Sequence, residues 1–315
     1  MRGFAALCVL ALALTVSMAE GAEGIEVSAA GFPATLTVPA GVDRPPTVLI
    51  IAGSGPTDRD GNSIVGVKAG YLSRLADDLA AKGIASLRYD KRGIGGSKPA
   101  GAEQDLSIST FVDDAEQVLN WLSARPDAGA IVLVGHSEGG LIALELVKQR
   151  AEFAGVVLLA TPGRPLAATL RDQVTAYPEP LRGQALEMIR EIEAGDNVGD
   201  VPAPLLPIFR PSIQPYLRSL FTLRPAQALA DLDMPALVIG GGTDLQVSQA
   251  DFEALSQARA GVESRWFDRM NHVLVDAPTE RKANIETYLS PRPGLSDGLA
   301  DTIAEFVTQA AKAPR

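Results

Sequence analysis

The chain has 315 residues, of which 46% are hydrophobic and 21% are charged, a composition typical of a globular protein with a sizeable core. Its 28 Lys and Arg against 38 Asp and Glu give a formal charge of -10, which argues against nucleic acid as a partner. Cys8 is the only cysteine, and the two histidines, His136 and His272, are too few for a multi-histidine metal centre. We therefore expect neither cysteine chemistry nor a histidine-bound metal.

Residues 1–19 have the pattern of an export signal. Arg2 precedes an apolar run from Phe4 to Val16, and the small residues Ser17 and Ala19 follow it. The run is shorter than the roughly 20 residues that span a bilayer, so we expect no stable membrane anchor. The sequence predicts cleavage near Ala19 and a mature protein that is periplasmic or secreted.

The segments after the signal alternate between strands and helices. Short runs of continuous apolar character predict buried strands of a parallel sheet at residues 47–52, 84–89, 131–134, 156–160 and 236–239. Apolar residues at helical spacing predict helices at residues 70–82, 109–124 and 138–150. Residues 25–38 alternate in polarity, as in an antiparallel hairpin at the edge of a sheet. This order predicts an α/β fold, with a mostly parallel sheet flanked by helices and right-handed crossovers.

Residues 162–225 interrupt this alternation, because they are rich in proline and contain no strand-like run. We interpret them as a helical cap inserted into a core formed by residues 20–161 and 226–315. Apolar side chains of this segment, such as Leu166, Leu170 and Leu217, are expected to roof an enclosed pocket.

The strand predicted at residues 131–134 runs directly into the sequence GHSEGG, residues 135–140, which a helical segment follows. A G-x-S-x-G turn between a strand and a helix holds its serine in strained geometry at the helix N-terminus. This context predicts that Ser137 is a nucleophile. The alternative interpretation is a glycine-rich turn with a serine that caps the helix.

A serine nucleophile needs a base, and the chain offers two histidines for this role. His136 adjoins Ser137 on the strand side and is expected to point away and to pack structurally. His272 is therefore the predicted base. Asp244, which follows a strand and three glycines, is the predicted acid that orients it, and Asp268 is a weaker alternative.

Two backbone N–H groups are expected to form an oxyanion hole, those of Glu138 and of Ser54 in the loop after the first parallel strand, with Gly53 as the next candidate in that loop. This loop continues with DRDGN, residues 58–62, which imitates a calcium loop but lacks its later ligands. We expect a structural loop, with Asp58 and Arg59 at the rim of the site.

The segment DKRGIGGS, residues 90–97, permits two interpretations. Its glycines could cradle a phosphate, or the loop could pack beside the serine turn with Asp90 or Arg92 in internal ion pairs. The second interpretation is favoured.

The ordered segments AGSGPTDRDGN, RYDKRGIGGS, GHSEGG, GGTDLQV and MNHVLV resemble the α/β-hydrolase superfamily across the mature chain. AGSGP-x-DRDGN together with DKRG-x-GGS is more narrowly similar to a group of bacterial EstD-like serine carboxylesterases. The resemblance implies an α/β-hydrolase fold, Ser137 as nucleophile, Asp244 as acid, His272 as base and no cofactor.

The substrate expected from this resemblance is a small-molecule ester with a short to medium acyl group, cleaved through an acyl-enzyme. Two other functions stay open. One is a serine peptidase or amidase of the same fold, and the other is a binding module without catalysis.

Overall fold

The computed structural model describes residues 24–99, 101–150, 153–291 and 293–313. The predicted export signal, residues 1–19, lies outside these ranges. Among the helices of the described ranges, none is both long enough and apolar enough to cross a membrane.

The described residues form an eight-stranded sheet in the order β1-β2-β4-β3-β5-β6-β7-β8. The strands are β1 (Gly24–Ala29), β2 (Phe32–Thr37), β3 (Thr47–Ile51), β4 (Ala85–Tyr89), β5 (Ile131–His136), β6 (Gly155–Leu159), β7 (Ala236–Gly241) and β8 (Val262–Phe267). The hairpin of β1 and β2 is antiparallel and lies at one edge, whereas β3 to β8 pair in parallel with one another. The predicted mostly parallel α/β sheet is thus confirmed.

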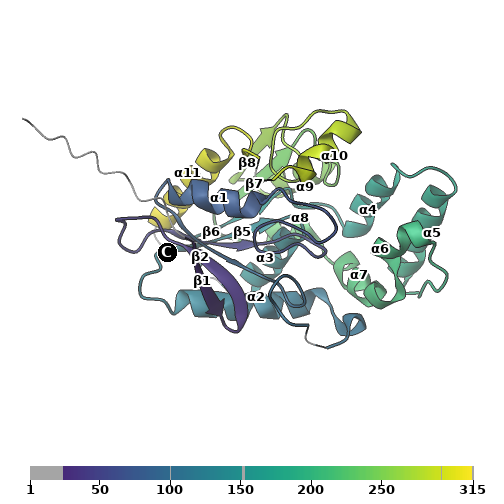
Figure 1. Cartoon of the computed structure of the whole chain (residues 1–315), viewed down its shortest axis with the longest axis horizontal. Helices are drawn as coiled ribbons and strands as arrows, with labels where there is room; N and C mark the ends of the chain where they lie inside the picture. The colour runs from purple at the N-terminus through teal and green to yellow at the C-terminus, as the bar shows by residue number, and fades with distance from the viewer. Residues whose placement is uncertain (1–23, 100, 151–152, 292, 314–315) are drawn as a thin grey trace, which may run out of the picture.

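Helices cover both faces of this sheet (Figure 1). Their bounds are α1 (Tyr71–Ala80), α2 (Ile108–Ser123), α3 (Glu138–Gln149), α8 (Pro225–Ala230), α9 (Gln249–Ser256), α10 (Arg281–Leu289) and α11 (Leu299–Lys312), with the 3-10 helix η1 (Glu103–Asp105) before α2. Successive side chains of a strand point to opposite faces. Accordingly, Val48 and Ile50 pack with α1 and α11, while Leu49 and Ile51 pack with α2 and α3. Burial on both faces explains why the central strands are continuously apolar.

Two strands extend further than the sequence indicates. β5 continues through Gly135 and His136, and β7 continues through Gly240 and Gly241, which the sequence places in a turn. Pairing with β8 holds these last two glycines, since Gly241 lies opposite Phe267. A side chain at Gly241 would overlap the backbone of the Met270 loop, so glycine permits the strand to approach that loop closely.

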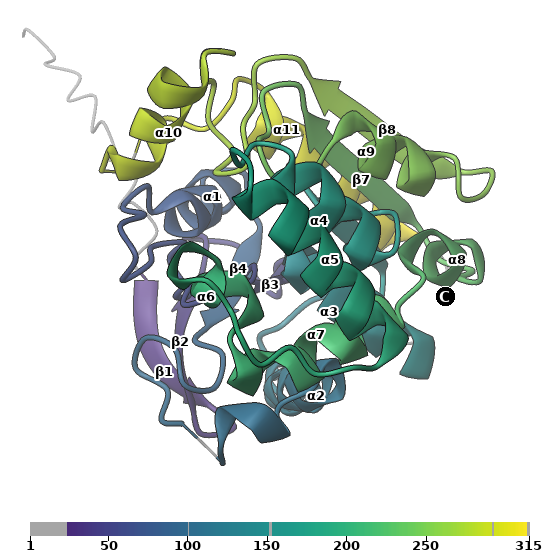
Figure 2. The same cartoon turned by 90° about the vertical axis from the view of Figure 1, so that its right-hand side faces the viewer.

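The segment between β6 and α8 contains helices joined by turns and loops, and no strand occurs in its described residues. Its helices are α4 (Leu166–Val174), α5 (Leu181–Ala194), η2 (Ala203–Leu205), α6 (Leu206–Phe209), η3 (Pro211–Ile213) and α7 (Gln214–Phe221). These helices share an apolar core that includes Val174, Ile189 and Phe209. Figures 1 and 2 show them grouped beyond one end of the sheet, where they cover the turn between β5 and α3.

Candidate active site

The turn after β5 holds Ser137 in an unusual backbone conformation, with φ of 54° and ψ of -121°. Its N–H donates to the carbonyl of Leu159 at 2.9 Å, which anchors the turn to the neighbouring strand. A side chain at Gly139 would overlap the Ile51 carbonyl, and one at Gly140 would overlap Thr161. Glycine therefore permits α3 to start directly against the sheet, and the predicted strand-turn-helix context of Ser137 is present.

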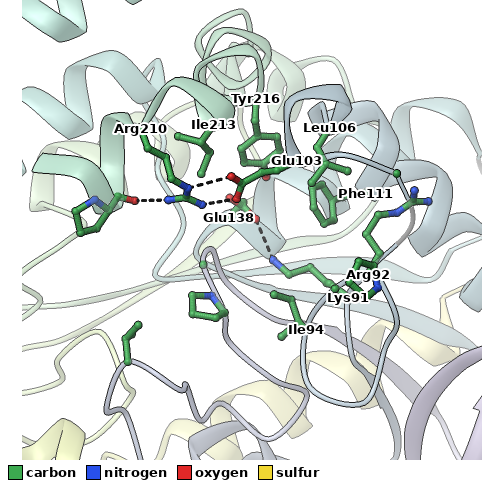
Figure 3. Close-up of a pocket in the computed structure, with 17 residues that line it drawn as sticks. Lys91, Arg92, Ile94, Glu103, Leu106, Phe111, Glu138, Arg210, Ile213 and Tyr216 are labelled. Atoms are coloured by element: carbon green, nitrogen blue, oxygen red, sulfur yellow. Dashed lines mark hydrogen bonds and ion pairs between the residues drawn. The ribbon is translucent and has the colours of Figure 1, made fainter. Parts of the chain in front are cut away.

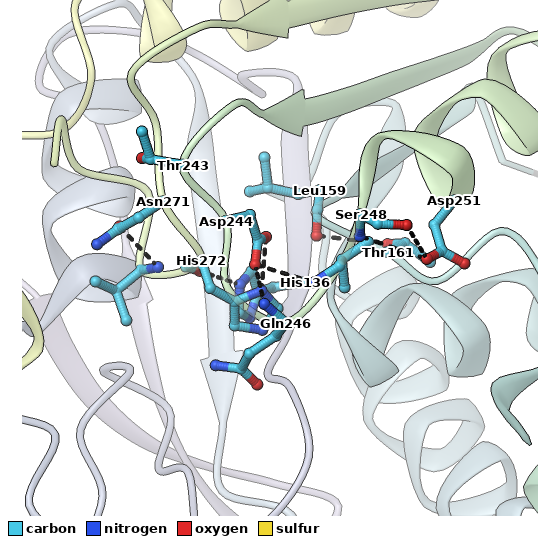
Figure 4. Close-up of polar contacts among 12 residues, drawn as sticks. His136, Leu159, Thr161, Thr243, Asp244, Gln246, Ser248, Asp251, Asn271 and His272 are labelled. Carbon is cyan, nitrogen blue, oxygen red and sulfur yellow. Dashed lines mark hydrogen bonds and ion pairs between the residues drawn. The ribbon is translucent and has the colours of Figure 1, made fainter. Parts of the chain in front are cut away.

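Asp244 and His272 form a close pair at the same end of the sheet (Figure 4). The Nδ1 of His272 lies 2.9 Å from Oδ2 of Asp244, and their side chains are only 7% and 1% exposed. The other carboxylate oxygen, Oδ1, accepts the N–H groups of Gln246 and Val247 at 2.7 and 3.0 Å. Because Oδ1 is occupied by the backbone, Oδ2 is directed at the imidazole. Asp268, the weaker candidate, is exposed and does not contact His272.

The loop that carries His272 is fixed by its neighbour Asn271. The Oδ1 of Asn271 accepts the N–H groups of Val273 and Val275 at 3.1 and 3.3 Å. Its Nδ2 donates to Asn284 at 3.2 Å and to Thr287 at 2.8 Å, both on α10. Asn271 is fully buried. Sequence reasoning missed this network, because nothing in the sequence indicates that α10 returns to the His272 loop.

His136 has the structural role that the sequence predicts. Its Nε2 lies 2.8 Å from the backbone carbonyl of His272, and its Nδ1 lies 3.2 Å from the Tyr71 hydroxyl. A carbonyl only accepts, so Nε2 carries the proton and Nδ1 accepts from Tyr71. Burial raises the pKa of Tyr71, which keeps this donor protonated. Burial also holds the pKa of His136 well below its ordinary value of 6.5. His136 is thus neutral and holds the His272 backbone in place through a hydrogen bond.

We expect His136 to make the protein sensitive to acid. Because the folded pKa is depressed, the unfolded chain takes up a proton below about pH 6.5 that the native state does not, so stability falls with acidification by up to about 1.4 kcal/mol per pH unit. His136→Gln removes this proton uptake and keeps an N–H donor for the His272 carbonyl. Urea unfolding at pH 7 and pH 5 should therefore show a smaller pH-dependent loss for the variant. An identical loss in both proteins would contradict the assignment.

His136 adjoins both Ser137 and the Asp244–His272 pair. The rings of His136 and His272 pack with centroids 4.8 Å apart, and His136 immediately precedes Ser137. Among the described residues, the Ser137 hydroxyl has no hydrogen-bond partner, so it is not hydrogen-bonded to His272 in this structure. Hydrogen bonds between nucleophile and base are often long in empty sites and tighten when substrate binds.

Ser137 opens into a cavity of about 330 Å³ beneath the cap helices. Ser54 and Glu138 line the same cavity, and the backbone N–H groups of both residues have no acceptor within the described chain. The structure thus brings the two predicted oxyanion donors to the cavity of the predicted nucleophile. Much of the remaining wall is aliphatic, and Gln173, Gln246 and Tyr216 also line it. The aliphatic residues are Leu141, Leu166, Leu170, Ile208, Leu217, Leu220 and Val247.

A second cavity, of about 550 Å³, continues from the first and shares Gly55, Glu138 and Tyr216 with it. Its charged lining residues are already paired (Figure 3). Lys91 lies 3.0 Å from Glu138, and Arg210 pairs with Glu103. The Arg210 guanidinium holds the pKa of Glu103 below its usual value, so this carboxylate is ionised and occupied. Sequence reasoning did not identify Lys91 as part of the site.

The loop at residues 58–62 is stabilised by its own side chains. The Oδ1 of Asp58 accepts the N–H groups of Asp60 and Asn62 at 2.9 and 2.8 Å, and Asp60 pairs with Arg88 of β4. In the described part of the chain, no three His, Cys, Asp or Glu side chains cluster so that they could hold a metal. Asp58 and Arg59 do not line either of the two cavities, and Arg59 pairs with Asp90.

The loop at residues 90–97 packs against itself. The Asp90 carboxylate accepts the N–H of Gly96 at 2.8 Å and the N–H of Arg59 at 2.8 Å, so the chain's own carboxylate takes the position that a phosphate would need. Arg92 donates through Nε to buried Asp114 at 2.6 Å. The interpretation as a packing loop with internal ion pairs is confirmed, and the phosphate interpretation is wrong.

Comparison with known proteins agrees with this architecture. Residues 65–185 match the family described as serine aminopeptidase, S33. The chain is 28% identical to Esterase EstD of Thermotoga maritima, with 92% of this chain and 68% of EstD covered. Two uncharacterised proteins of Mycobacterium tuberculosis are 29% identical, and 59% of their length is covered.

Solved structures show the same fold at low identity. Est1E of Butyrivibrio proteoclasticus, determined with ferulic acid bound, has a TM-score of 0.59 at 17% identity, covering 90% of this chain and 96% of Est1E. Proline iminopeptidase of Mycobacterium smegmatis has a TM-score of 0.55 at 17% identity, covering 92% of this chain and 99% of that one. Taken with the sheet order and the turn at Ser137, these similarities show that the chain has the α/β-hydrolase fold and that it is similar to Esterase EstD.

Proposed function

We propose that the protein hydrolyses carboxylic esters through a Ser137–His272–Asp244 triad and an acyl-enzyme intermediate. The observation that carries this proposal is the buried Asp244–His272 pair beside a serine in nucleophile-elbow geometry. The similarity to Esterase EstD supports esters as the substrate class.

The proposed reaction uses the proton positions that the contacts define. Nδ1–H of His272 donates to Asp244, which leaves Nε2 unprotonated and basic. When Ser137 Oγ attacks the ester carbonyl, Nε2 takes its proton, and the carbonyl oxygen becomes an oxyanion that accepts the N–H groups of Ser54 and Glu138. The same proton then passes to the leaving alcohol, which yields the acyl-enzyme. A water molecule, deprotonated by His272, releases the acid and restores Ser137.

The two cavities suggest where the acyl and alcohol parts of the ester bind. We assign the acyl group to the smaller cavity, because it holds Ser137 and its walls are mostly apolar. The alcohol is assigned to the larger cavity, where Lys91, Glu138, Arg210 and Glu103 form two ion pairs. A volume of about 330 Å³ is at the lower end for ligand pockets, which supports short to medium acyl groups.

The family description raises aminopeptidase activity as a second candidate. Such an enzyme must bind the ammonium group of a peptide, which calls for a free carboxylate in the site. Of the described residues that line the two cavities, the acidic ones are Glu103 and Glu138, and each is already paired with a cation. A neutral ester therefore suits the site better than an aminoacyl group.

Acyl-length profiling tests the proposed function. We expect turnover of aryl esters to be highest at roughly two to eight acyl carbons within a series of about two to sixteen, and to exceed that of matched aminoacyl anilides. Leu217→Ala enlarges the smaller cavity and should shift the optimum to longer chains. Leu186→Ala, on the exposed side of α5, serves as the control and should not shift it.

Three results would contradict the proposal in different ways. A maximum at the longest chains would contradict the acyl-length assignment, and faster cleavage of anilides would favour the peptidase. No turnover of any ester or amide would favour a binding module.

A further inference from the structure

Lys91 is a buried ammonium group in a position that the proposed reaction does not yet use. Its side chain is 3% exposed, and Nζ donates to the Gly53 carbonyl at 2.6 Å and to Oε1 of Glu138 at 3.0 Å. The ring of Phe111 lies 5.5 Å from Nζ. We propose that Lys91 is a positioning residue that holds both oxyanion donors in place. This inference rests on the proposed function.

The contact with Gly53 fixes the first donor. The carbonyl of Gly53 and the N–H of Ser54 belong to one planar trans peptide, so they point in opposite directions. When Nζ of Lys91 holds the carbonyl, the N–H of Ser54 is directed away from Lys91. Ser54 lines the cavity of Ser137, and this N–H has no other partner in the described chain. A hydrogen bond at the carbonyl also polarises the peptide and strengthens its N–H as a donor.

The contact with Glu138 fixes the second donor. Glu138 is the first residue of α3, and its N–H is the other proposed oxyanion donor. Its side chain is 9% exposed and is bound to the same ammonium group. Lys91, from the loop after β4, thus joins the loop after β3 to the start of α3. Figure 3 shows its contact with Glu138. The distance between the two donors depends on one cation.

Burial gives a second reason to assign Lys91 a role in the reaction. A buried ion pair contributes little net stability, since desolvation offsets its attraction. An ammonium group behind the Gly53–Ser54 peptide, however, adds positive charge on the side opposite the developing oxyanion. In a site with little water, such fixed charges and dipoles stabilise the transition state more than the ground state.

The test compares Lys91→Met/Glu138→Gln with Glu138→Gln as its baseline. The paired change avoids an uncompensated Glu138 carboxylate and keeps the Glu138 backbone N–H. Relative to the baseline, we expect kcat for an aryl ester to fall roughly 10- to 100-fold, because a donor is misplaced rather than deleted, while KM changes less than about threefold. The affinity for a trifluoromethyl ketone, which forms an oxyanion on Ser137, should fall in parallel, and that for the matching alcohol should not.

Arg88→Met is the matched control. Arg88 is a buried cation three residues earlier, with 4% of its side chain exposed, and it pairs with Asp60 outside both cavities. Its loss should leave kcat within about twofold of wild type. If the paired variant fails to fold, Lys91→Ala replaces it, because the larger cavity should admit ethylamine. The amine should restore kcat in a saturable way.

Two outcomes would overturn the role of Lys91. The first is a folded paired variant whose kcat and ketone affinity lie within about twofold of the Glu138→Gln baseline. The second is a folded Lys91→Ala enzyme that keeps wild-type turnover, or whose lost turnover ethylamine does not restore. Ester turnover by the wild type, and its loss in Ser137→Ala, test the proposed function separately. If these hold while Lys91 variants are fully active, only the inference fails.

Discussion

Ser137→Ala and His272→Ala are each expected to lower kcat for an aryl ester by roughly 10⁴- to 10⁶-fold, and the double variant is expected to be no slower than either one. The two side chains act as one unit, because Oγ attacks only when Nε2 removes its proton. Without Ser137 the base has no nucleophile to activate, and without His272 the hydroxyl stays protonated. The first substitution therefore already removes the rate acceleration that the pair supplies, and the second causes no further loss of kcat.

Steady-state kinetics of the two single variants and the double variant measure this loss. Labelling by a fluorophosphonate, which reacts with activated serines, should disappear in both single variants. Ser256→Ala, at the end of α9, is the control and should keep wild-type rates and labelling. Activity of His272→Ala within a few-fold of wild type would refute the assignment, because His136, the other described histidine, is occupied at both ring nitrogens.

The positions of the central strands along the chain, and the site residues that follow them, could be predicted from the sequence for a physical reason. Central parallel strands are buried on both faces, so their apolar runs are continuous and their ends are easily seen. Ser54, Ser137 and Asp244 follow such strands, whereas His272 follows β8, an edge strand that is not continuously apolar. The carboxyl ends of parallel strands meet at one edge of a sheet, which brings residues far apart in sequence to one site.

The contacts that hold these residues in place could not be predicted. Lys91 reaches Glu138 across 47 residues, and His136 reaches the His272 carbonyl across 136. Such pairings depend on how loops turn after they leave the sheet, and a lysine in a loop is usually solvated. The DKRG segment predicts a packing loop, but nothing in the sequence indicates that Lys91 is buried. Local pattern predicts strand ends well and loop contacts poorly.

Asp244→Asn is expected to lower kcat by roughly 10³- to 10⁴-fold at neutral pH while the protein stays folded. In the wild type, the N–H groups of Gln246 and Val247 hold Oδ1, and Oδ2 accepts Nδ1–H of His272. An asparagine would keep its carbonyl oxygen on the two backbone donors, which turns its NH₂ group towards His272. Nδ1 must then accept, so the proton moves to Nε2 and the imidazole can no longer take a proton from Ser137.

Asp268→Asn separates this effect from a general loss of negative charge near His272. Asp268 is exposed and lies on the same loop as His272, yet it makes no contact with the imidazole. Its substitution should leave kcat within about twofold of wild type, because an exposed charge is screened by solvent. Kinetics of both variants, with thermal unfolding to confirm that each is folded, decide between the two carboxylates. A larger loss in Asp268→Asn than in Asp244→Asn would reverse the assignment of the acid. Equal, small losses in both would mean that the tautomer of His272 is set by something other than Asp244.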